Sequence, residues 1–336
     1  MQARADLYLV QYREAIRSGE IIAGQELIME LDKLIEELDN PRYKYDTTDA
    51  YERIDFIEGC VRLTKSPFYG KPMQLMLWQK AFIEVVYSYK MADTGFDRFQ
   101  KILLLIARKN GKSETCSALA LTELITGPLG ADIVCSSNDD IQASIIYDAI
   151  DAMRLMIDPA QQDTWRNQRC IRCNITNSKV FKLSDRTRNK EGRNIDFAIL
   201  DESHEMKENV IAKSVEQSQS LKENPKFFNI TTEGFVNDGY LDDELRKFRA
   251  VLNGEDTGVA AERMLPWLYT QDSEAEVWQD ESTWQKSNPT LGIVKKWDYL
   301  RGQIDQAKKS KATRMFVLSK DFNFKQSNSQ AWLLPE

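Results

Sequence analysis

The sequence predicts an α/β fold built around a mostly parallel, doubly wound sheet. Three apolar runs, at residues 102–107, 131–136 and 196–200, have the length and branching of buried strands. Helix-forming stretches follow the first two runs, at 114–124 and 141–156. Because strands that alternate with helices are typical of parallel sheets, these segments are expected to form one such sheet.

Composition describes a globular chain rather than a membrane protein or a disulfide scaffold. Of the 336 residues, 42% are hydrophobic and 29% are charged. No apolar stretch approaches the roughly 20 residues of a membrane span, and no apolar signal segment opens the sequence, so an intracellular location is expected. Five cysteines, an odd number, argue against a disulfide framework. The single histidine, His204, excludes any site that needs two.

Basic residues are concentrated in two stretches, 166–193 and 295–325, although the net charge is −7. The acidic net charge gives no overall indication of nucleic-acid binding. Each basic stretch is either a local DNA contact or a solvated face of the protein.

Between the first predicted strand and its helix lies the sequence Ala-Arg-Lys-Asn-Gly-Lys-Ser, residues 107–113. A strand, a compact turn and a helix that starts at Gly-Lys-Ser form the architecture of a phosphate-binding loop. Gly111 lets the backbone come close, Lys112 reaches the β- and γ-phosphates, and the Ser113 hydroxyl ligates Mg²⁺. Ile106 stands where the full motif has its first glycine, and the alternative is an ordinary turn before a helix.

Two carboxylates, Asp201 and Glu202, directly follow the apolar run at 196–200. Because open α/β sheets bind ligands at the carboxyl ends of their strands, Asp201 is expected to hold Mg²⁺. Glu202 is expected to orient or deprotonate the attacking water. Either acid alone fits a solvated strand end, but the pair follows the phosphate loop by about 90 residues. The combination predicts a P-loop NTPase of the ASCE, RecA-like type.

Two other segments are candidates for the nucleotide site. Gln79, next to Trp78, lies 33 residues before Lys112, and its amide can read an adenine edge. The alternative is a surface glutamine beside a core tryptophan. The strand predicted at 226–230 ends in Thr231 and Thr232, which are expected beside the γ-phosphate or, alternatively, as a capped strand end.

The predicted organisation has three parts. Residues 1–65 form an N-terminal helical arm, with helices at 3–17, 23–38 and 49–63. The ATPase core takes residues 66–252, including a hairpin of strands around the turn 176–178. Residues 253–336 form a small, mainly helical lid or linker with an edge strand at 265–269.

With these motifs placed, the sequence resembles the large subunit of tailed-bacteriophage terminases, the DNA-packaging motors. The matching segments, in the family's order, are residues 78–79, 107–113, 197–204, 231–234 and 284–292. Residues 323–332 also look like the connector that precedes the nuclease domain in that family. The resemblance accounts for Ile106, since these proteins commonly lack the first glycine, and for Arg108, which matches an arginine inside their loop.

The resemblance implies an ATPase motor that uses ATP and Mg²⁺ to drive double-stranded DNA into a prohead in the cytoplasm of the infected bacterial host. The implied partners are the portal protein, the prohead, the small terminase subunit and further copies of the chain in a ring, commonly a pentamer. The family's large subunit also carries a metal-dependent nuclease after the linker. No acidic cluster follows the linker before Glu336, so nuclease activity is not expected from this chain.

The expected site residues follow from both lines of argument. Glu202, Lys112 and Arg108 are the catalytic candidates, Ser113 and Asp201 the metal ligands, and Thr231 and Thr232 the coupling residues. ATP contacts are expected from Trp78, Gln79, Arg108, Lys109, Asn110, Gly111, Lys112 and Ser113. Terminases are similar in carrying a trans-acting arginine upstream of the acidic strand, and the candidates here, in order, are Arg193, Arg188 and Arg186. Glu191 occupies the position before Gly192 where some relatives place that arginine, and the alternative for each candidate is a solvated or DNA-facing charge.

Two functions of other classes stay open. Residues 201–204 fit the box of a DExH-type helicase literally, but such an enzyme needs a second motor domain with arginines, and the last 80 or so residues show no such element. The other is a scaffold that binds nucleotide without hydrolysis, which a phosphate-release assay distinguishes from a motor.

Overall fold

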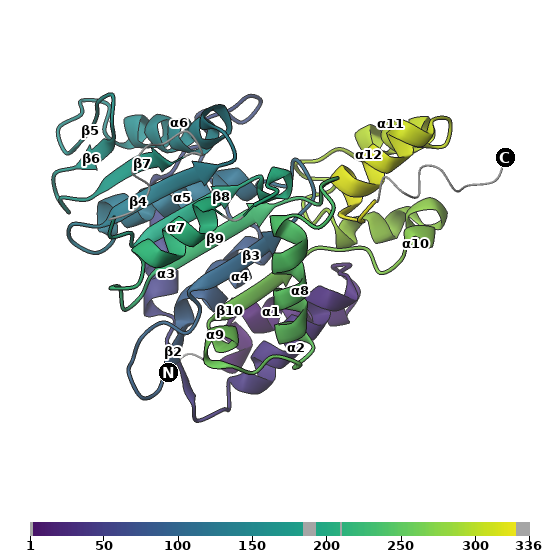
Figure 1. Cartoon of the computed structure of the whole chain (residues 1–336), viewed down its shortest axis with the longest axis horizontal. Coiled ribbons are helices and arrows are strands. Elements are labelled where there is room, and N and C mark those ends of the chain that lie inside the picture. Colours follow the sequence, from purple (N-terminus) through teal and green to yellow (C-terminus); the bar gives the residue numbers. More distant parts are fainter. Residues whose placement is uncertain (1–2, 184–192, 209, 327–336) are drawn as a thin grey trace.

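A parallel sheet forms the centre of the computed structural model, which describes residues 3–183, 193–208 and 210–326 (Figure 1). The sheet has eight strands in the order β10-β3-β9-β8-β4-β7-β6-β5. Neighbours from β10 to β7 run parallel, and the hairpin strands β6 and β5 extend one edge antiparallel. The strands are β3 (Lys101–Leu105), β4 (Asp132–Ser137), β5 (Thr164–Arg166), β6 (Ile171–Cys173), β7 (Lys179–Leu183), β8 (Phe197–Asp201), β9 (Lys226–Thr231) and β10 (Met264–Leu268). The predicted doubly wound sheet and its hairpin are confirmed.

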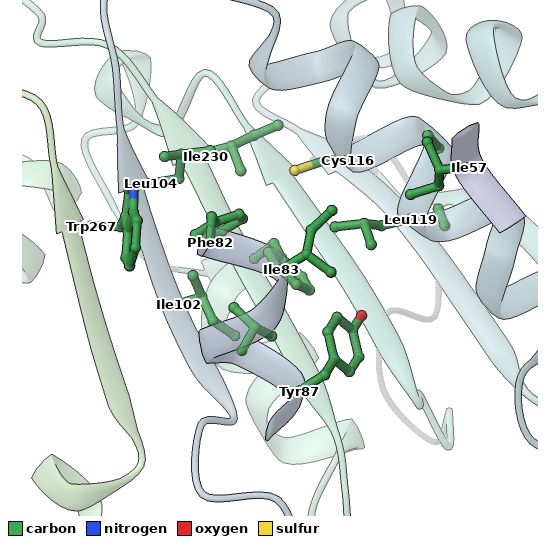
Figure 2. Close-up of a cluster of buried hydrophobic side chains, with 14 of the residues drawn as sticks. Ile57, Phe82, Ile83, Tyr87, Ile102, Leu104, Cys116, Leu119, Ile230 and Trp267 are labelled. Carbon is green, nitrogen blue, oxygen red and sulfur yellow. The ribbon is translucent and has the colours of Figure 1, made fainter. Parts of the chain in front are cut away.

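Helices cover both faces of this sheet, because its central strands are apolar on both sides. On β3, Ile102 and Leu104 belong to the cluster shared with the helices α1 to α6, whereas Leu103 and Leu105 pack with α8. Figure 2 shows the part of the first cluster where Ile102 and Leu104 meet side chains of α3, α4 and α5. The helices on the first face are α1 (Tyr8–Arg17), α2 (Gln25–Glu37), α3 (Thr48–Cys60), α4 (Leu77–Ser88), α5 (Lys112–Thr126) and α6 (Asp140–Ile157). α7 (Val210–Ser218) and α8 (Tyr240–Leu252), which the sequence did not indicate, cover the other, followed by the short α9 (Val259–Glu262).

The N-terminal helices share the core of the sheet. The three predicted helices are present as α1, α2 and α3, and their apolar side chains join the largest buried cluster. The buried carboxylate of Glu84 on α4 accepts the N–H groups of Tyr8 and Leu9 at the start of α1. A two-stranded sheet, β1 (Tyr43–Tyr45) with β2 (Tyr89–Met91), adds a further connection. The predicted arm is therefore an integral layer of the fold.

A small helical subdomain follows the last strand. It consists of α10 (Glu274–Gln279), a 3-10 helix (Glu281–Lys286), α11 (Trp297–Ala307) and α12 (Lys311–Phe322), packed around Trp284. The predicted edge strand is present as β10, but it pairs in parallel with β3. The boundary predicted at residue 252 therefore lies inside the sheet-forming part of the chain. None of the helices in the described ranges has the length and apolarity to span a bilayer.

Candidate nucleotide site

The predicted phosphate loop joins β3 to α5. α5 begins at Lys112, so its first N–H groups lack intrahelical partners and its dipole presents a positive end. Two residues of the loop are in the left-handed region, Lys109 at φ 64° and Gly111 at φ 84°. Glycine adopts this conformation freely, whereas a lysine there stores strain on the order of 1 kcal/mol. Ile106 is buried and its N–H donates to the carbonyl of Thr231, so the strand simply continues through the position of the missing glycine.

The two predicted acids meet this loop. Lys112 Nζ donates to Glu202 Oε1 at 2.8 Å and lies 3.6 Å from Asp201 Oδ1. Ser113 Oγ donates to Asp201 Oδ2 at 3.2 Å. Glu202 has a left-handed backbone at φ 55°, and its N–H donates to Asp201 Oδ1 at 2.9 Å. Four residues from two motifs 90 positions apart are thus brought together as the sequence indicates.

One ammonium group faces two carboxyl groups in this site. Burial opposes the charge of Lys112, but Asp201 and Glu202 outweigh it and raise the pKa of the lysine. Burial also raises the pKa of Asp201, against the opposing effect of Lys112. At Glu202 burial acts in the same direction, but there the attraction of Lys112 prevails and lowers the pKa. A cation placed next to Asp201 would therefore relieve an unfavourable charge.

The donor set fits a magnesium–nucleotide complex. The Ser113 hydroxyl and the Asp201 carboxylate, 3.2 Å apart, are the hard oxygen ligands that Mg²⁺ prefers. Mg²⁺ takes few protein ligands when phosphate oxygens and water supply the rest. The described residues contain no cluster of three or more metal-binding side chains.

His204 and Thr231 extend the site beyond Glu202. His204 Nδ1 lies 3.2 Å from Glu202 Oε2 and 3.1 Å from Thr231 Oγ1. Burial, with the nearby charge of Lys320, lowers the pKa of His204 to about 3, so the imidazole is neutral at pH 7. Thr231 thus contacts His204 of the acidic motif, and its coupling role stays a prediction. The sequence analysis gave His204 no role of its own beyond its place in the motif at residues 201–204, and it did not predict this contact.

The adenine candidates, Trp78 and Gln79, lie in the first turn of α4. Trp78 is 2% exposed and packs edge-to-face against Tyr269 in the core. Gln79 Nε2 donates to Thr115 Oγ1 at 2.7 Å, and its Oε1 accepts the N–H of Met76. Trp78 therefore presents no open ring face to a base, and both ends of the Gln79 amide already have partners. The alternative of a core tryptophan describes Trp78.

Asn110 is directed at the C-terminal subdomain. Its Oδ1 accepts from the N–H and the hydroxyl of Thr290 at 3.1 and 2.8 Å, and its Nδ2 donates to Asn288 Oδ1 at 3.0 Å. The N–H of Arg108 donates to the carbonyl of Lys320 at 3.1 Å. The loop thus makes hydrogen bonds to residues of the C-terminal subdomain that lie 178 or more positions away, which no local pattern could reveal.

Arg193 lies apart from these contacts. Its guanidinium carbon lies 4.3 Å from the centre of the Phe181 ring, and its Nε is buried without a hydrogen-bond partner among the described residues. The other candidates, Arg188 and Arg186, lie outside the described residues, as do Glu191 and Gly192.

Three of the described basic residues in the first basic stretch are ion-paired. Its described ion pairs are Arg166 with Asp148 and Asp151, Lys179 with Asp132, and Lys182 with Asp140. Acids of β4 and α6 therefore offset the positive charge of these three residues.

Comparisons with known proteins place this geometry in context. The family model described as "Terminase large subunit, ATPase domain" matches residues 77–250. The terminase large subunit of Lactococcus phage p2 is 23% identical over 323 residues, covering 90% of this chain and 57% of the relative. That of Enterobacteria phage HK97 is 27% identical over 270 residues, covering 76% of this chain and 49% of the relative.

A solved structure shares the fold. The crystal structure of the HK97 bacteriophage large terminase superposes with a TM-score of 0.69 at 22% identity, covering 82% of this chain and 55% of that one. The chain thus spans about half the length of the relatives it matches.

Proposed function

The chain belongs to the family of terminase large-subunit ATPase domains, and from this premise we propose that it is the ATP-hydrolysing motor that moves double-stranded viral DNA into a prohead. The observation that carries the proposal is Lys112 at the start of α5, facing Asp201 and Glu202 at the end of β8. Membership of this family favours a packaging ATPase over a DExH-type helicase or a scaffold that binds nucleotide without hydrolysis.

The geometry supports a separate role in ATP hydrolysis for each of these residues. Lys112 leaves Glu202 for the β- and γ-phosphates, which frees the carboxylate to orient the attacking water. Ser113 and Asp201 would hold Mg²⁺, and the ion would neutralise charge on the phosphate oxygens. Arg108, in the same loop, adds positive charge near the phosphates. The left-handed backbone at Glu202 aims its side chain back toward the loop.

Phosphate release from Mg-ATP tests hydrolysis. Lys112→Ala should lose nucleotide affinity and turnover, because no other described side chain faces both acids with a positive charge. Lys213→Ala, an exposed lysine on α7, is the matched control and should behave as wild type. Equal turnover in Lys112→Ala and the control would remove the phosphate loop from the mechanism.

For DNA, we propose a grip on phosphates without sequence preference, since a motor must move any sequence. Because the net charge is −7, we propose that the grip comes from local basic stretches and from several copies acting together in a ring, with the portal protein and the small subunit as further partners of the motor. Two unrelated duplexes of equal length should bind equally, with affinity falling steeply as salt rises. Strong preference for one duplex, or binding that ignores salt, would contradict a motor.

We also propose that an arginine from a neighbouring copy completes the site. Such a residue supplies about 10³–10⁵ in rate in related chemistry, and the fork of arginine bridges two phosphate oxygens. Arg193 is the described candidate, ahead of Arg188 and Arg186. Arg193→Ala subunits should bind ATP and regain hydrolysis when mixed with Glu202→Gln subunits. No recovery for any of the three would leave Arg108, acting within its own subunit.

A further inference from the structure

His204 connects the carboxylate of Glu202 to the end of β9. Its Nδ1 lies within 3.2 Å of Glu202 Oε2 and 3.1 Å of Thr231 Oγ1, and the residue is 4% exposed. A carboxylate can only accept, so Nδ1 must carry the hydrogen. Nε2 has no hydrogen-bond partner among the described residues, and the carboxylate of Glu205 is 3.7 Å away. The polar contacts that orient this imidazole ring are therefore those of Nδ1.

Two acceptors compete for this one hydrogen. The hydroxyl of Thr231 donates to the carbonyl of Thr232 at 3.0 Å and accepts the backbone N–H of His204 at 3.3 Å. Its oxygen is thus an acceptor toward Nδ1, as is Glu202 Oε2. Because both oxygens share the N–H of His204, a movement or a change of charge at Glu202 alters the hydrogen bond to Thr231, and the reverse also holds.

The other oxygen of Glu202, Oε1, is the one whose hydrogen-bond partner changes in the proposed reaction. Oε1 accepts from Lys112 Nζ at 2.8 Å. When Lys112 turns to the phosphates, His204 is the side chain that still holds Glu202 among the described residues. Without it, a carboxylate on a left-handed backbone would be free to rotate away from the loop.

We propose that His204 is a positioning residue that keeps Glu202 directed at the phosphate loop after Lys112 has left it, and that relays the state of this carboxylate to Thr231. The inference rests on the proposed role of Glu202 in orienting water. It adds to that role a partner on the neighbouring strand, Thr231 of β9, reached through His204.

The surroundings fix the ring in this position and extend the relay. A Cβ on Gly234 would lie 2.8 Å from the Cβ of His204, so the imidazole lies against a site where only glycine fits. Beyond Thr231, the carbonyl of Glu233 accepts from Lys320 Nζ at 2.9 Å. The carbonyl of Lys320 in turn accepts from Arg108 of the phosphate loop. A change at Thr231 therefore has a direct route to α12 and back to the loop.

The test compares His204→Ala with His204→Asn, because an asparagine amide can donate from nearly the same place as Nδ1. In steady-state ATP hydrolysis, His204→Ala should lower kcat by about 10- to 100-fold, the size of effect expected when a catalytic group is misaligned, with KM for ATP little changed. His204→Asn should recover most of kcat. In a Glu202→Gln background, His204→Ala should cause no further loss.

The outcomes separate this inference from the proposed function. Wild-type kcat in His204→Ala, together with an inactive Glu202→Gln, would overturn the positioning role alone. Full activity in Glu202→Gln would overturn the role of Glu202 itself. If His204→Ala does not fold, as judged by its urea unfolding transition, His204→Asn decides: wild-type-like kcat supports the donor role, and a loss as large as that of Glu202→Gln contradicts it.

Discussion

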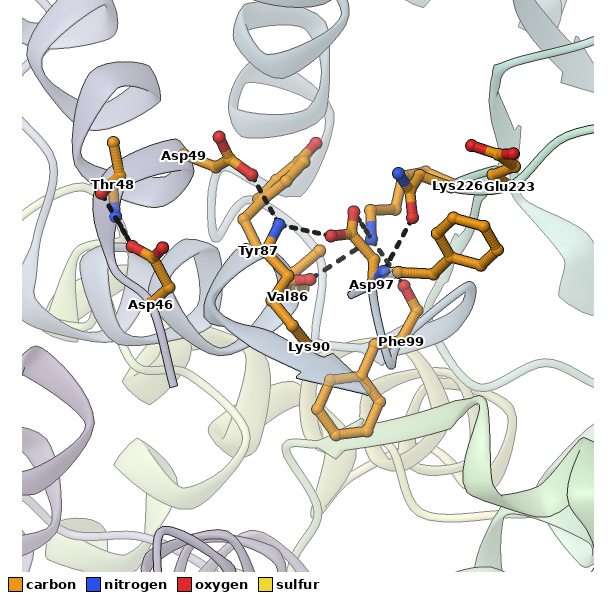
Figure 3. A network of polar contacts seen from close by, with 12 residues as sticks. Asp46, Thr48, Asp49, Val86, Tyr87, Lys90, Asp97, Phe99, Glu223 and Lys226 are labelled. Atoms are coloured by element: carbon orange, nitrogen blue, oxygen red, sulfur yellow. Dashed lines mark hydrogen bonds and ion pairs between the residues drawn. The ribbon is translucent and has the colours of Figure 1, made fainter. Parts of the chain in front are cut away.

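Two clusters of buried charge lie at opposite ends of the central strands, and they are built differently. At the amino ends, Lys226 Nζ lies 2.8 Å from Asp97 Oδ2 and donates to the carbonyls of Phe99 and Val86 (Figure 3). Asp97 also pairs with Lys90, which pairs with Asp49. Two ammonium groups thus face two carboxylates. At the carboxyl ends, Lys112 is the one ammonium group among the described residues that pairs with Asp201 and Glu202.

The difference indicates which cluster stabilises the fold and which one is built to bind a ligand. The amino-end cluster is balanced in charge. The carboxyl-end cluster combines excess negative charge with left-handed backbone at Lys109 and Glu202 and with buried polar atoms of His204 and Thr232 that have no hydrogen-bond partner among the described residues. Strain and incomplete pairing persist where a ligand completes the site.

The largest expected effect comes from breaking the balanced cluster. Asp97→Ala leaves Lys226, which is 3% exposed, without a carboxylate partner, and should cost about 3–5 kcal/mol in the free energy of urea unfolding. Asp49→Ala is the matched control, because the Asp49 side chain is 50% exposed and Lys90 keeps Asp97, so its loss should stay below about 1 kcal/mol. Equal losses of stability in the two variants would contradict the claim that the buried cluster around Asp97 stabilises the fold.

The pH dependence of stability sharpens the comparison at the other end. His204 in the folded chain has a pKa of about 3, against an ordinary value of 6.5. Below pH 6.5 the unfolded chain therefore binds a proton that the folded chain does not, and stability falls as the pH falls. Between pH 7 and 5 wild type should lose about 2 kcal/mol more than His204→Asn. Parallel pH profiles of unfolding for the two proteins would show that the histidine is not held neutral.

The smallest effect has the opposite sign. Asp201→Asn removes a charge that burial makes unfavourable. Its amide oxygen can take the place of Oδ1 and accept the N–H of Glu202, while its amide N–H, in the place of Oδ2, can donate to the Ser113 hydroxyl oxygen. Without nucleotide this variant should therefore be more stable than wild type, by about 1 kcal/mol, as is usual for relieving strain at a working site. Urea unfolding without Mg²⁺ measures it, and a clear destabilisation would mean that the acids are balanced after all.

The features that could be predicted from the sequence are those encoded by short local patterns. Strand, loop and helix around Lys112, and the acids after β8, follow from short apolar runs and their neighbours. The contacts of Asn110 with Thr290 and of His204 with Thr231 join distant positions through side chains, so no periodicity marks them. Likewise the run at Met264–Leu268 indicates a strand, but its pairing with β3 depends on tertiary packing.

The most direct test of the account is a pair of measurements on Glu202→Gln, namely ATP affinity and phosphate release with Mg²⁺. A glutamine no longer competes for Lys112, so ATP should bind as tightly as to wild type or more tightly, while turnover falls by at least about a hundredfold. Wild-type turnover in this variant would show that the unbalanced cluster is not where ATP is hydrolysed.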